Sequence, residues 1–337
     1  MTKNFFAFFF FCLSCFYGFS QDVHLSQYYT NQQNLNPATS GMYEGRNRLV
    51  VNHRSQWGQL SSTPLTTSIA AFDQKIYFKG DEINAGILVL RDQFQDFGFN
   101  TDKIHLTSSY EKFYRGHELR GGIQLGFTLK NTDFSKQTFP NQWVYQEGEF
   151  DQSLSNMEDG LAESQNFFDL NLGLAWSKDY GKIKPKGGLA VFHVNNPKDS
   201  YFNDSEARLA LRYVLHAAAE IQLLSDLSLT PQLLYMRART AQDMMIGGKI
   251  EKQLMNMGDL QHVFAGIQYR DGFGRNADAV IPLAGLAYKN VEVGISYDFN
   301  VSELSSYGGN KSTFEISLIY TAPEFIPNKM TLPCDRF

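Results

Sequence analysis

The seven histidines are the side chains best suited to bind a metal ion or to move protons, so their spacing is the first thing to test. None stands in an HxH, HxxxH or HExxH pattern, and the chain beyond residue 20 holds no CxxC pair. GxSxG, Walker and GxGxxG patterns are also absent. The sequence therefore predicts no catalytic residue, no metal ligand and no cofactor. A lipase with a Ser/His pair on neighbouring strands would leave no local pattern, and that alternative stays open.

One acidic segment, residues 147–163, could in principle bind Ca²⁺, which prefers oxygen ligands. It fails the EF-hand pattern counted from Asp151, because Asn156 stands where glycine is needed and Ala162 where glutamate is needed. We interpret the segment as a solvated external loop. Its carboxylates, which no Lys or Arg accompanies, are those of Glu147, Glu149, Asp151, Glu158, Asp159 and Glu163.

The first twenty residues predict export. Lys3 is followed by an apolar and aromatic run from Phe5 to Phe19, and Gly18 and Ser20 are small residues at −3 and −1 from a cut before Gln21. This is the layout of a secretory signal peptide, and the run is shorter than the roughly 20 residues that a membrane helix needs. We therefore expect residues 1–20 to be a signal peptide.

Without that segment, Cys334 is the only cysteine, so an internal disulfide is excluded. Removing Lys3 from the 30 basic residues leaves 29 against 35 acidic ones, a net charge of −6. Such a balance gives no basic surface for nucleic acid. No later apolar run reaches 18 residues, so helical membrane spans are not expected.

Alternation of apolar and polar residues recurs through the mature chain. Leu170, Leu172 and Leu174, for example, alternate with Asn171 and Gly173. Soluble sandwiches alternate too, but these runs extend over about 9–12 residues, the length of a tilted transmembrane strand. Small and polar residues on one face and aromatic residues at the run ends also favour a membrane barrel. We expect Leu172 to face lipid and Asn171 to face the lumen.

Fourteen such runs can be counted, and their connections alternate in length. The long connections, such as 130–166 and 194–207, follow odd-numbered runs, whereas short turns follow most even-numbered ones. An outer-membrane barrel that begins in the periplasm has this asymmetry. The connection at 252–259 is long for its side, and Pro231 predicts a bulge or a misplaced boundary. The runs start near residues 47, 65, 84, 103, 118, 167, 184, 208, 226, 242, 260, 278, 291 and 313.

Motifs at both ends of the mature chain resemble the PorP/SprF family. The first set comprises Ser26-Gln27-Tyr28, Asn36-Pro37-Ala38, Gly41, Arg54-Ser55-Gln56-Trp57 and Pro64. The second comprises Ser296-Tyr297-Asp298, Val301-Ser302, Leu304, Phe314 to Leu318 and the terminal Cys334-Asp335-Arg336-Phe337. Asp335 departs from the family's usual Cys-Pro-Arg-Phe ending, and His53 and Ser55 stand where an aromatic residue and Asn are common.

The resemblance implies an outer-membrane protein of type IX secretion and gliding motility, with about fourteen strands, no catalysis and no cofactor. The implied partners are periplasmic and outer-membrane components of type IX secretion, a large secreted adhesin and the lipid bilayer. An accessory or anchoring role in export or surface display is the favoured function. A passive or substrate-specific diffusion channel is the alternative, because strand alternation alone would serve it equally well.

The expected organisation is a signal peptide at 1–20, a periplasmic leader at 21–46, a barrel at 47–320 and a periplasmic tail at 321–337. The leader motifs are expected to bind a periplasmic partner or to plug the lumen. The alternative is that they form an entry segment that packs under the first strand. Trp57 is better explained as an interface tryptophan. The candidate partner-binding residues are Ser26, Gln27, Tyr28, Asn36, Pro37 and Ala38.

Overall fold

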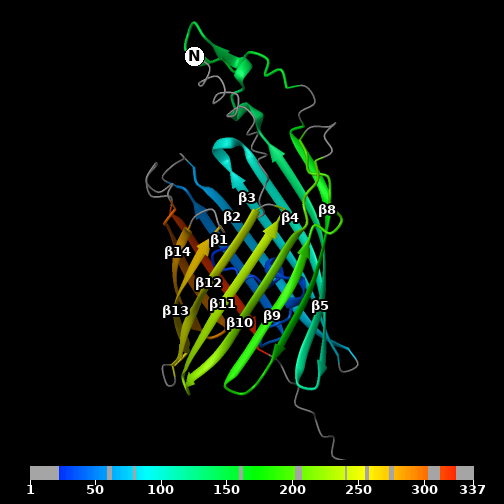
Figure 1. Ribbon diagram of the computed structural model, residues 1–337, viewed down its shortest axis with the longest axis vertical. Coiled ribbons are helices and arrows are strands. Elements are labelled where there is room, and N and C mark those ends of the chain that lie inside the picture. The colour runs from blue at the N-terminus through cyan, green and yellow to red at the C-terminus, as the bar shows by residue number, and fades with distance from the viewer. Residues whose placement is uncertain are drawn as a thin grey trace, which may run out of the picture.

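A single closed β-barrel makes up most of the structure (Figure 1). The computed structural model describes residues 23–58, 63–78, 81–158, 162–201, 207–239, 241–254, 258–272, 277–302 and 312–323. The predicted signal peptide and the tail beyond residue 323, with Cys334, lie outside these residues. Among the described residues, no helix has the length and apolar character needed to cross a membrane.

Fourteen antiparallel strands form the barrel, which confirms the predicted fold class and strand number. The first strand closes the sheet by pairing with the last, from Asn47 opposite Ala322 to Gln56 opposite Thr313. The strands are β1 (Asn47–Gln56), β2 (Leu65–Phe78), β3 (Asp81–Phe94), β4 (Phe99–Tyr114), β5 (His117–Thr132), β8 (Ser164–Lys178), β9 (Ile183–Phe192), β10 (Arg212–Leu224), β11 (Leu227–Ala238), β12 (Ala241–Gln253), β13 (Leu260–Asp271), β14 (Ala277–Tyr288), β15 (Val291–Asn300) and β16 (Thr313–Ala322).

Side chains alternate between the outside and the lumen along each strand, as the sequence pattern predicted. In β8, Leu172 is 42% exposed on the outer wall, whereas Asn171 is fully buried inside. The Asn171 side chain donates from Nδ2 to Oε1 of Gln124 at 2.9 Å, and its Oδ1 accepts from the backbone N–H of His193 at 3.0 Å. The outer wall is therefore an apolar surface suited to lipid, and the inner wall is hydrogen-bonded.

The two ends of the barrel differ. At the short-turn end, Arg115 and Gly116 join β4 to β5 with φ values of 50° and 78°, the left-handed pair that a two-residue hairpin requires. At the opposite, long-loop end, residues 133–158 rise above the barrel (Figure 1). They contain a small hairpin of β6 (Trp143–Val144) and β7 (Glu149–Phe150) and the short helices η3 (Phe134–Lys136) and η4 (Pro140–Gln142). The short helix η2 (Gln95–Phe97) lies in the separate connection between β3 and β4.

Each strand begins within four residues of its predicted start. The connection between β12 and β13 is longer than the other connections expected to be short turns, but it does not change the strand count. The expectation for Pro231 was wrong. Pro231 lies inside β11, in continuous register opposite Gly248 of β12, and the only shift between β10 and β11 falls at Gln222/Leu224. In the pairing of β11 with β10, Ala218 pairs with Gln232 and Ile221 pairs with Leu229, but the residues between these two pairs are not paired. The missing proline N–H therefore interrupts the ladder without shifting its register.

Arginine at position 172 should strongly reduce the amount of assembled barrel. Leu172 lies midway along β8 on the lipid-facing wall, where an arginine costs about 2–4 kcal/mol. Leu172→Phe keeps a large apolar side chain at the same site and serves as the control. The measurement is the fraction of outer-membrane protein that shifts in gel mobility on boiling. Equal loss in both variants would mean that this face does not contact lipid.

Candidate functional site

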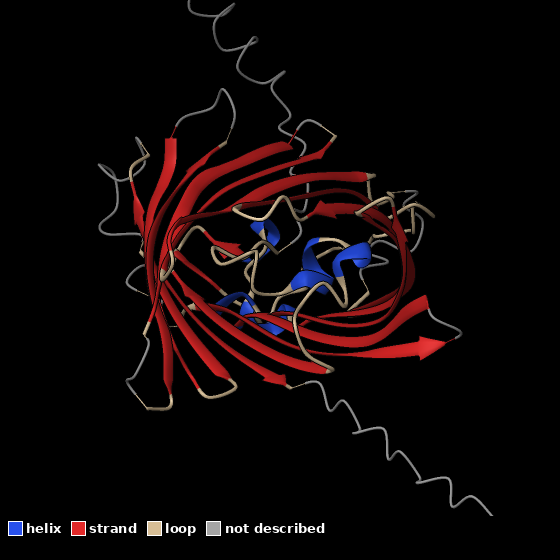
Figure 2. Cartoon of the chain, turned by 90° about the horizontal axis from the view of Figure 1, so that it is seen from below, coloured by secondary structure: helices blue, strands red, loops and turns tan. Residues whose placement is uncertain are grey.

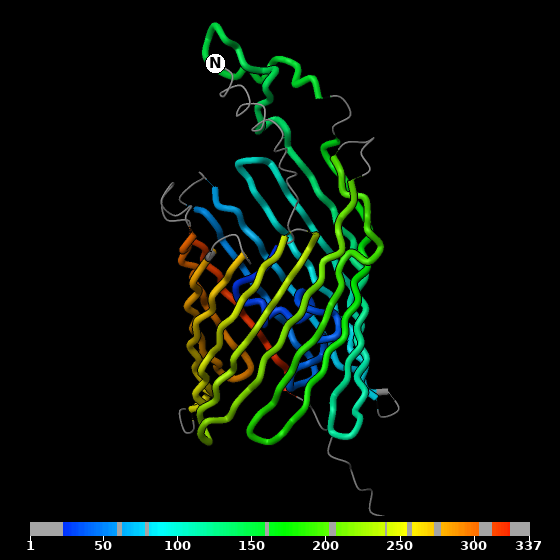
Figure 3. Tube along the Cα trace, viewed as in Figure 1, coloured from blue at the N-terminus to red at the C-terminus, as the bar shows by residue number. Residues whose placement is uncertain are grey.

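The described part of the predicted periplasmic leader, residues 23–46, lies inside the barrel; it is called the leader below. Figures 2 and 3 show it crossing the lumen, with its short helices surrounded by strands. It contains α2 (Gln32–Leu35) and the 3₁₀ helix η1 (Pro37–Thr39). All six candidate residues, Ser26, Gln27, Tyr28, Asn36, Pro37 and Ala38, are buried. Partner binding by these residues stays a prediction, while their position fits the alternative of a lumen plug.

Local capping shapes the leader into two turns. Asn31 precedes α2 and accepts a hydrogen bond from the backbone N–H of Asn34 at 3.3 Å. Asn36 precedes η1, and its side-chain oxygen accepts from the N–H of Ala38 at 2.9 Å. Pro37 occupies the first position of η1, where a missing N–H costs nothing. The Asn-Pro-Ala motif is thus a self-capped turn with the amide nitrogen of Asn36 left to bind the barrel wall.

That turn rests on three glycines of adjacent strands, Gly122 in β5, Gly173 in β8 and Gly188 in β9, which together are called the glycine seat. A Cβ atom at Gly122 would lie 2.6 Å from Ala38 Cα, and one at Gly188 would lie 2.6 Å from Asn36 Nδ2. A side chain at Gly122 would displace the leader backbone, and one at Gly188 would displace the side chain of Asn36. These three glycines form the surface on which the Asn-Pro-Ala turn lies.

Asn36 also makes side-chain hydrogen bonds to the wall. Its Nδ2 donates to the carbonyl oxygens of Leu174, at 3.0 Å, and Leu189, at 3.2 Å. It lies 3.1 Å from Nε2 of His216. These contacts attach the turn to β8, β9 and β10 without a charged group.

The start of the leader is attached to buried charges on the closing strands. The backbone N–H groups of Ser26 and Gln27 donate to the two carboxylate oxygens of Glu315 at 2.7 and 2.9 Å. The hydroxyl of Ser26 donates to Asp298 at 2.7 Å. The side chain of Gln27 completes the contact by donating to Glu315 O at 3.2 Å and accepting from Ser317 Oγ at 2.8 Å.

Alternating acids and arginines continue this network across five strands, β13 to β16 and β1. Arg54 binds Asp298 and Glu315, each at 3.2 Å. Arg270 binds Asp298 at 2.9 Å and Asp278 at 2.5 Å. Buried charges persist only where each has opposite partners and hydrogen bonds, and here both barrel and leader supply them.

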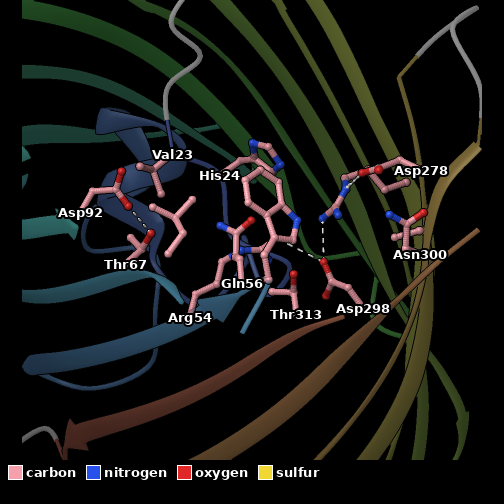
Figure 4. Close-up of a pocket in the computed structure, with 14 residues that line it drawn as sticks. Val23, His24, Arg54, Gln56, Thr67, Asp92, Asp278, Asp298, Asn300 and Thr313 are labelled. Carbon is pink, nitrogen blue, oxygen red and sulfur yellow. Dashed lines mark hydrogen bonds and ion pairs between the residues drawn. The ribbon is translucent and has the colours of Figure 1, made fainter. Parts of the chain in front are cut away.

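A cavity of about 360 Å³, called the vestibule, opens above this network at the long-loop end (Figure 4). Val23 and His24 of the leader and Trp57 line it together with the charged residues. Its wall is polar and carries both signs of charge. Within the described residues, no group of three or more His, Cys, Asp or Glu side chains is arranged to hold a metal ion.

Two apolar patches on the inner wall were not predicted. Tyr28 packs on one patch, formed by Ala190, Phe192, Val214, Leu234, Met245, Ala279 and Ile281. Leu25 packs on the other, formed by Ile69, Ala71, Leu88 and Leu90. The sequence did contain a signal. From Leu233 to Met236, the residues that point to both faces of the strand are apolar, so those that face the lumen must pack against another apolar group.

A closed barrel with an apolar outer wall defines an outer-membrane β-barrel protein. The chain belongs to the family described as Type IX secretion system membrane protein PorP/SprF, which matches residues 18–320. This confirms the resemblance seen in the sequence and makes the protein an outer-membrane component of type IX secretion. No curated protein matches the chain.

Several solved structures share the architecture. The CymD monoaromatic hydrocarbon channel is 9% identical with a TM-score of 0.50, covering 87% of this chain and 94% of CymD. A mutant of the TodX monoaromatic hydrocarbon channel is 10% identical with a TM-score of 0.50, covering 84% and 91%. The Pseudomonas putida toluene transporter TodX is 10% identical with a TM-score of 0.49, covering 90% and 94%. At such identities the likeness shows the fold alone.

Valine at Gly122 should loosen the leader, whereas valine at the neighbouring Gly121 should not. A Cβ at Gly122 meets the leader backbone, while a Cβ at Gly121 has no neighbour within 4 Å. Overpacking of this kind costs about 1–3 kcal/mol. We expect Gly122→Val to lower the temperature at which the folded gel band converts to the unfolded one, and to expose the leader to protease. Identical behaviour of the two variants would show that the glycine seat does not hold the leader.

Proposed function

We propose that this chain is an accessory or anchoring barrel of type IX secretion that supports export or surface display of a partner adhesin, in gliding motility or attachment. Membership of the PorP/SprF family supports the secretion part of the proposal. The adhesin and the anchoring role go further than the family alone, and they rest on two features of the barrel.

The first feature, which carries the proposal, is the filled lumen. The leader occupies the interior between Ser26 near the long-loop end and Gly41, which lies beside Asn84 and Arg120 near the short-turn end. Two further cavities beside the leader hold only about 10 and 20 Å³, roughly the space of one water molecule. A barrel filled in this way suits a role in contacting proteins better than one in passing solutes.

The second feature is the projecting loop at the long-loop end. In it, the rings of Trp143 and Phe150 pack edge to face at 4.8 Å, and Tyr145 at the tip of the hairpin is 91% exposed. Exposed aromatic residues on a structured loop are typical of protein contact surfaces. This loop is the region that we assign to the exported partner.

The leader motifs are the proposed contact with a periplasmic partner, and their burial limits when that partner can bind. Ser26 and Asn36 are fully buried, so a partner can reach them only when the leader leaves the lumen. Substitutions at these residues therefore test plugging and partner contact together, and they need a readout of barrel assembly beside the readout of export.

Deletion of the gene should remove one large adhesin from the cell surface while other type IX cargo is still exported. A gene copy with alanines at Ser26-Gln27-Tyr28 and Asn36-Pro37-Ala38 should fail to restore display. Surface proteins would be compared by labelling intact cells, with the heat-dependent gel shift reporting barrel assembly. A copy carrying Gly121→Val, which touches nothing in the lumen, is the matched control and should restore display.

If the deletion strain displays every surface protein but fails to take up a particular solute, the secretion proposal is wrong and the channel alternative replaces it. If the alanine copy restores normal display of the adhesin, the proposed role of the leader motifs is wrong, while the secretion proposal stands.

The purified barrel should conduct few ions, because the leader and its contacts fill the lumen. In planar bilayers we expect no stable conductance steps from the full mature chain, whereas Gly122→Val should show intermittent openings as the leader loosens. Large, steady steps from the unaltered protein would contradict a filled lumen and favour the channel alternative.

A further inference from the structure

A cleft of about 1120 Å³ opens on the outer wall of the barrel at the long-loop end, and it is called the arginine cleft below. It lies between residues 207–211 and the outer faces of β10 and β11, both labelled in Figure 1. Arg208, Arg237 and Arg239 line it, and all three are exposed. No Asp or Glu is among the lining residues that the structure describes.

The cleft lies where the apolar wall meets the loops. Tyr213 of β10, opposite Arg237 of β11, is 51% exposed, and Tyr235 also lines the cleft. Leu215, two residues further toward the short-turn end on the same outward face, is 42% exposed. Tyrosines at this level mark the interface of a membrane barrel. The arginines therefore lie at the height of lipid headgroups, directly above wall that lipid chains must cover.

Local contacts hold the two elements that carry the arginines. Arg208 donates to the carbonyl oxygen of Asn196 at 3.2 Å, which attaches the 207–211 segment to the loop beside it. Tyr235 donates from its hydroxyl to Gln242 at 3.2 Å, across the hairpin that carries Arg237 and Arg239. The three cations thus come from two structural elements and face one cleft.

Arginine is suited to phosphate because its planar guanidinium donates two parallel hydrogen bonds to phosphate oxygens. A ligand for this cleft must carry anionic groups at the height of the arginines and apolar chains below them. Three arginines exceed what one phosphate requires. We propose that the arginine cleft binds the phosphorylated sugar headgroup of an outer-leaflet glycolipid, whose acyl chains lie along β10 and β11.

Titration of the purified full mature chain with lipid A, followed by native mass spectrometry, tests the proposal. The wild-type protein should retain lipid A and bind its dephosphorylated form at least tenfold more weakly. The Arg237→Gln/Arg239→Gln double variant should lose about tenfold in lipid A affinity, as expected when charge-assisted hydrogen bonds are removed. Phosphatidylglycerol, an anionic phospholipid with one phosphate, should bind more weakly than lipid A.

Arg91→Gln is the matched control, because Arg91 also lies exposed on the outer wall at this end, bound to Asp102 at 2.6 and 3.0 Å, and does not line the cleft. Its lipid A affinity should stay within twofold of wild type. Equal binding of phosphorylated and dephosphorylated lipid A, a comparison that needs no variant, would overturn the proposal. So would an unchanged affinity in the folded double variant, and equal binding of phosphatidylglycerol would overturn the choice of glycolipid.

Discussion

The pairing of β1 with β16 is the contact on which the other features depend. Hydrocarbon cannot hydrogen-bond the free N–H and C=O groups of an edge strand, so a sheet in a membrane must close. Ten residue pairs between Asn47–Gln56 and Thr313–Ala322 close it here. The same two strands place Arg54 and Glu315 side by side in the lumen, where they form the buried attachment point of the leader.

Closure at fourteen strands creates an interior that the wall cannot fill by itself. About eight strands give a lumen that side chains just fill, and sixteen or more leave an aqueous channel. In this barrel the leader supplies the missing volume, and it does so with chemistry matched to each part of the wall. Its N–H groups meet Glu315, Tyr28 covers the apolar patch around Leu234, and the self-capped turn at Asn36 fits the glycine seat. A hydrogen bond to a charged group contributes about 1.5–3 kcal/mol, so the leader's bonds to Glu315 are a substantial part of the stability of the assembly.

Strand positions could be predicted from the sequence because alternation is a local property of each run. The lipid-facing Leu172 and the lumen-facing Asn171 follow from the same pattern. The path of the leader could not be predicted in this way, since Ser26 meets Glu315 across a separation of 289 residues and no short motif encodes that contact. Gly122, Gly173 and Gly188 are unremarkable as sequence and gain meaning only when three strands bring them together. The apolar residues that face the lumen around Leu234 were visible in the sequence, but the Tyr28 side chain that packs on them was not. The expectation for Pro231 failed because a missing N–H can leave a ladder in register.

The attachment of Ser26 to the last two strands has a consequence for the order of assembly. The leader is synthesised before any strand, yet Asp298 and Glu315, which hold it, belong to β15 and β16. The site for residues 26 and 27 does not exist until the end of the chain has joined the sheet. A segment that is translated before every strand is therefore among the last to reach its final place, and a seated leader reports that the whole barrel has been completed.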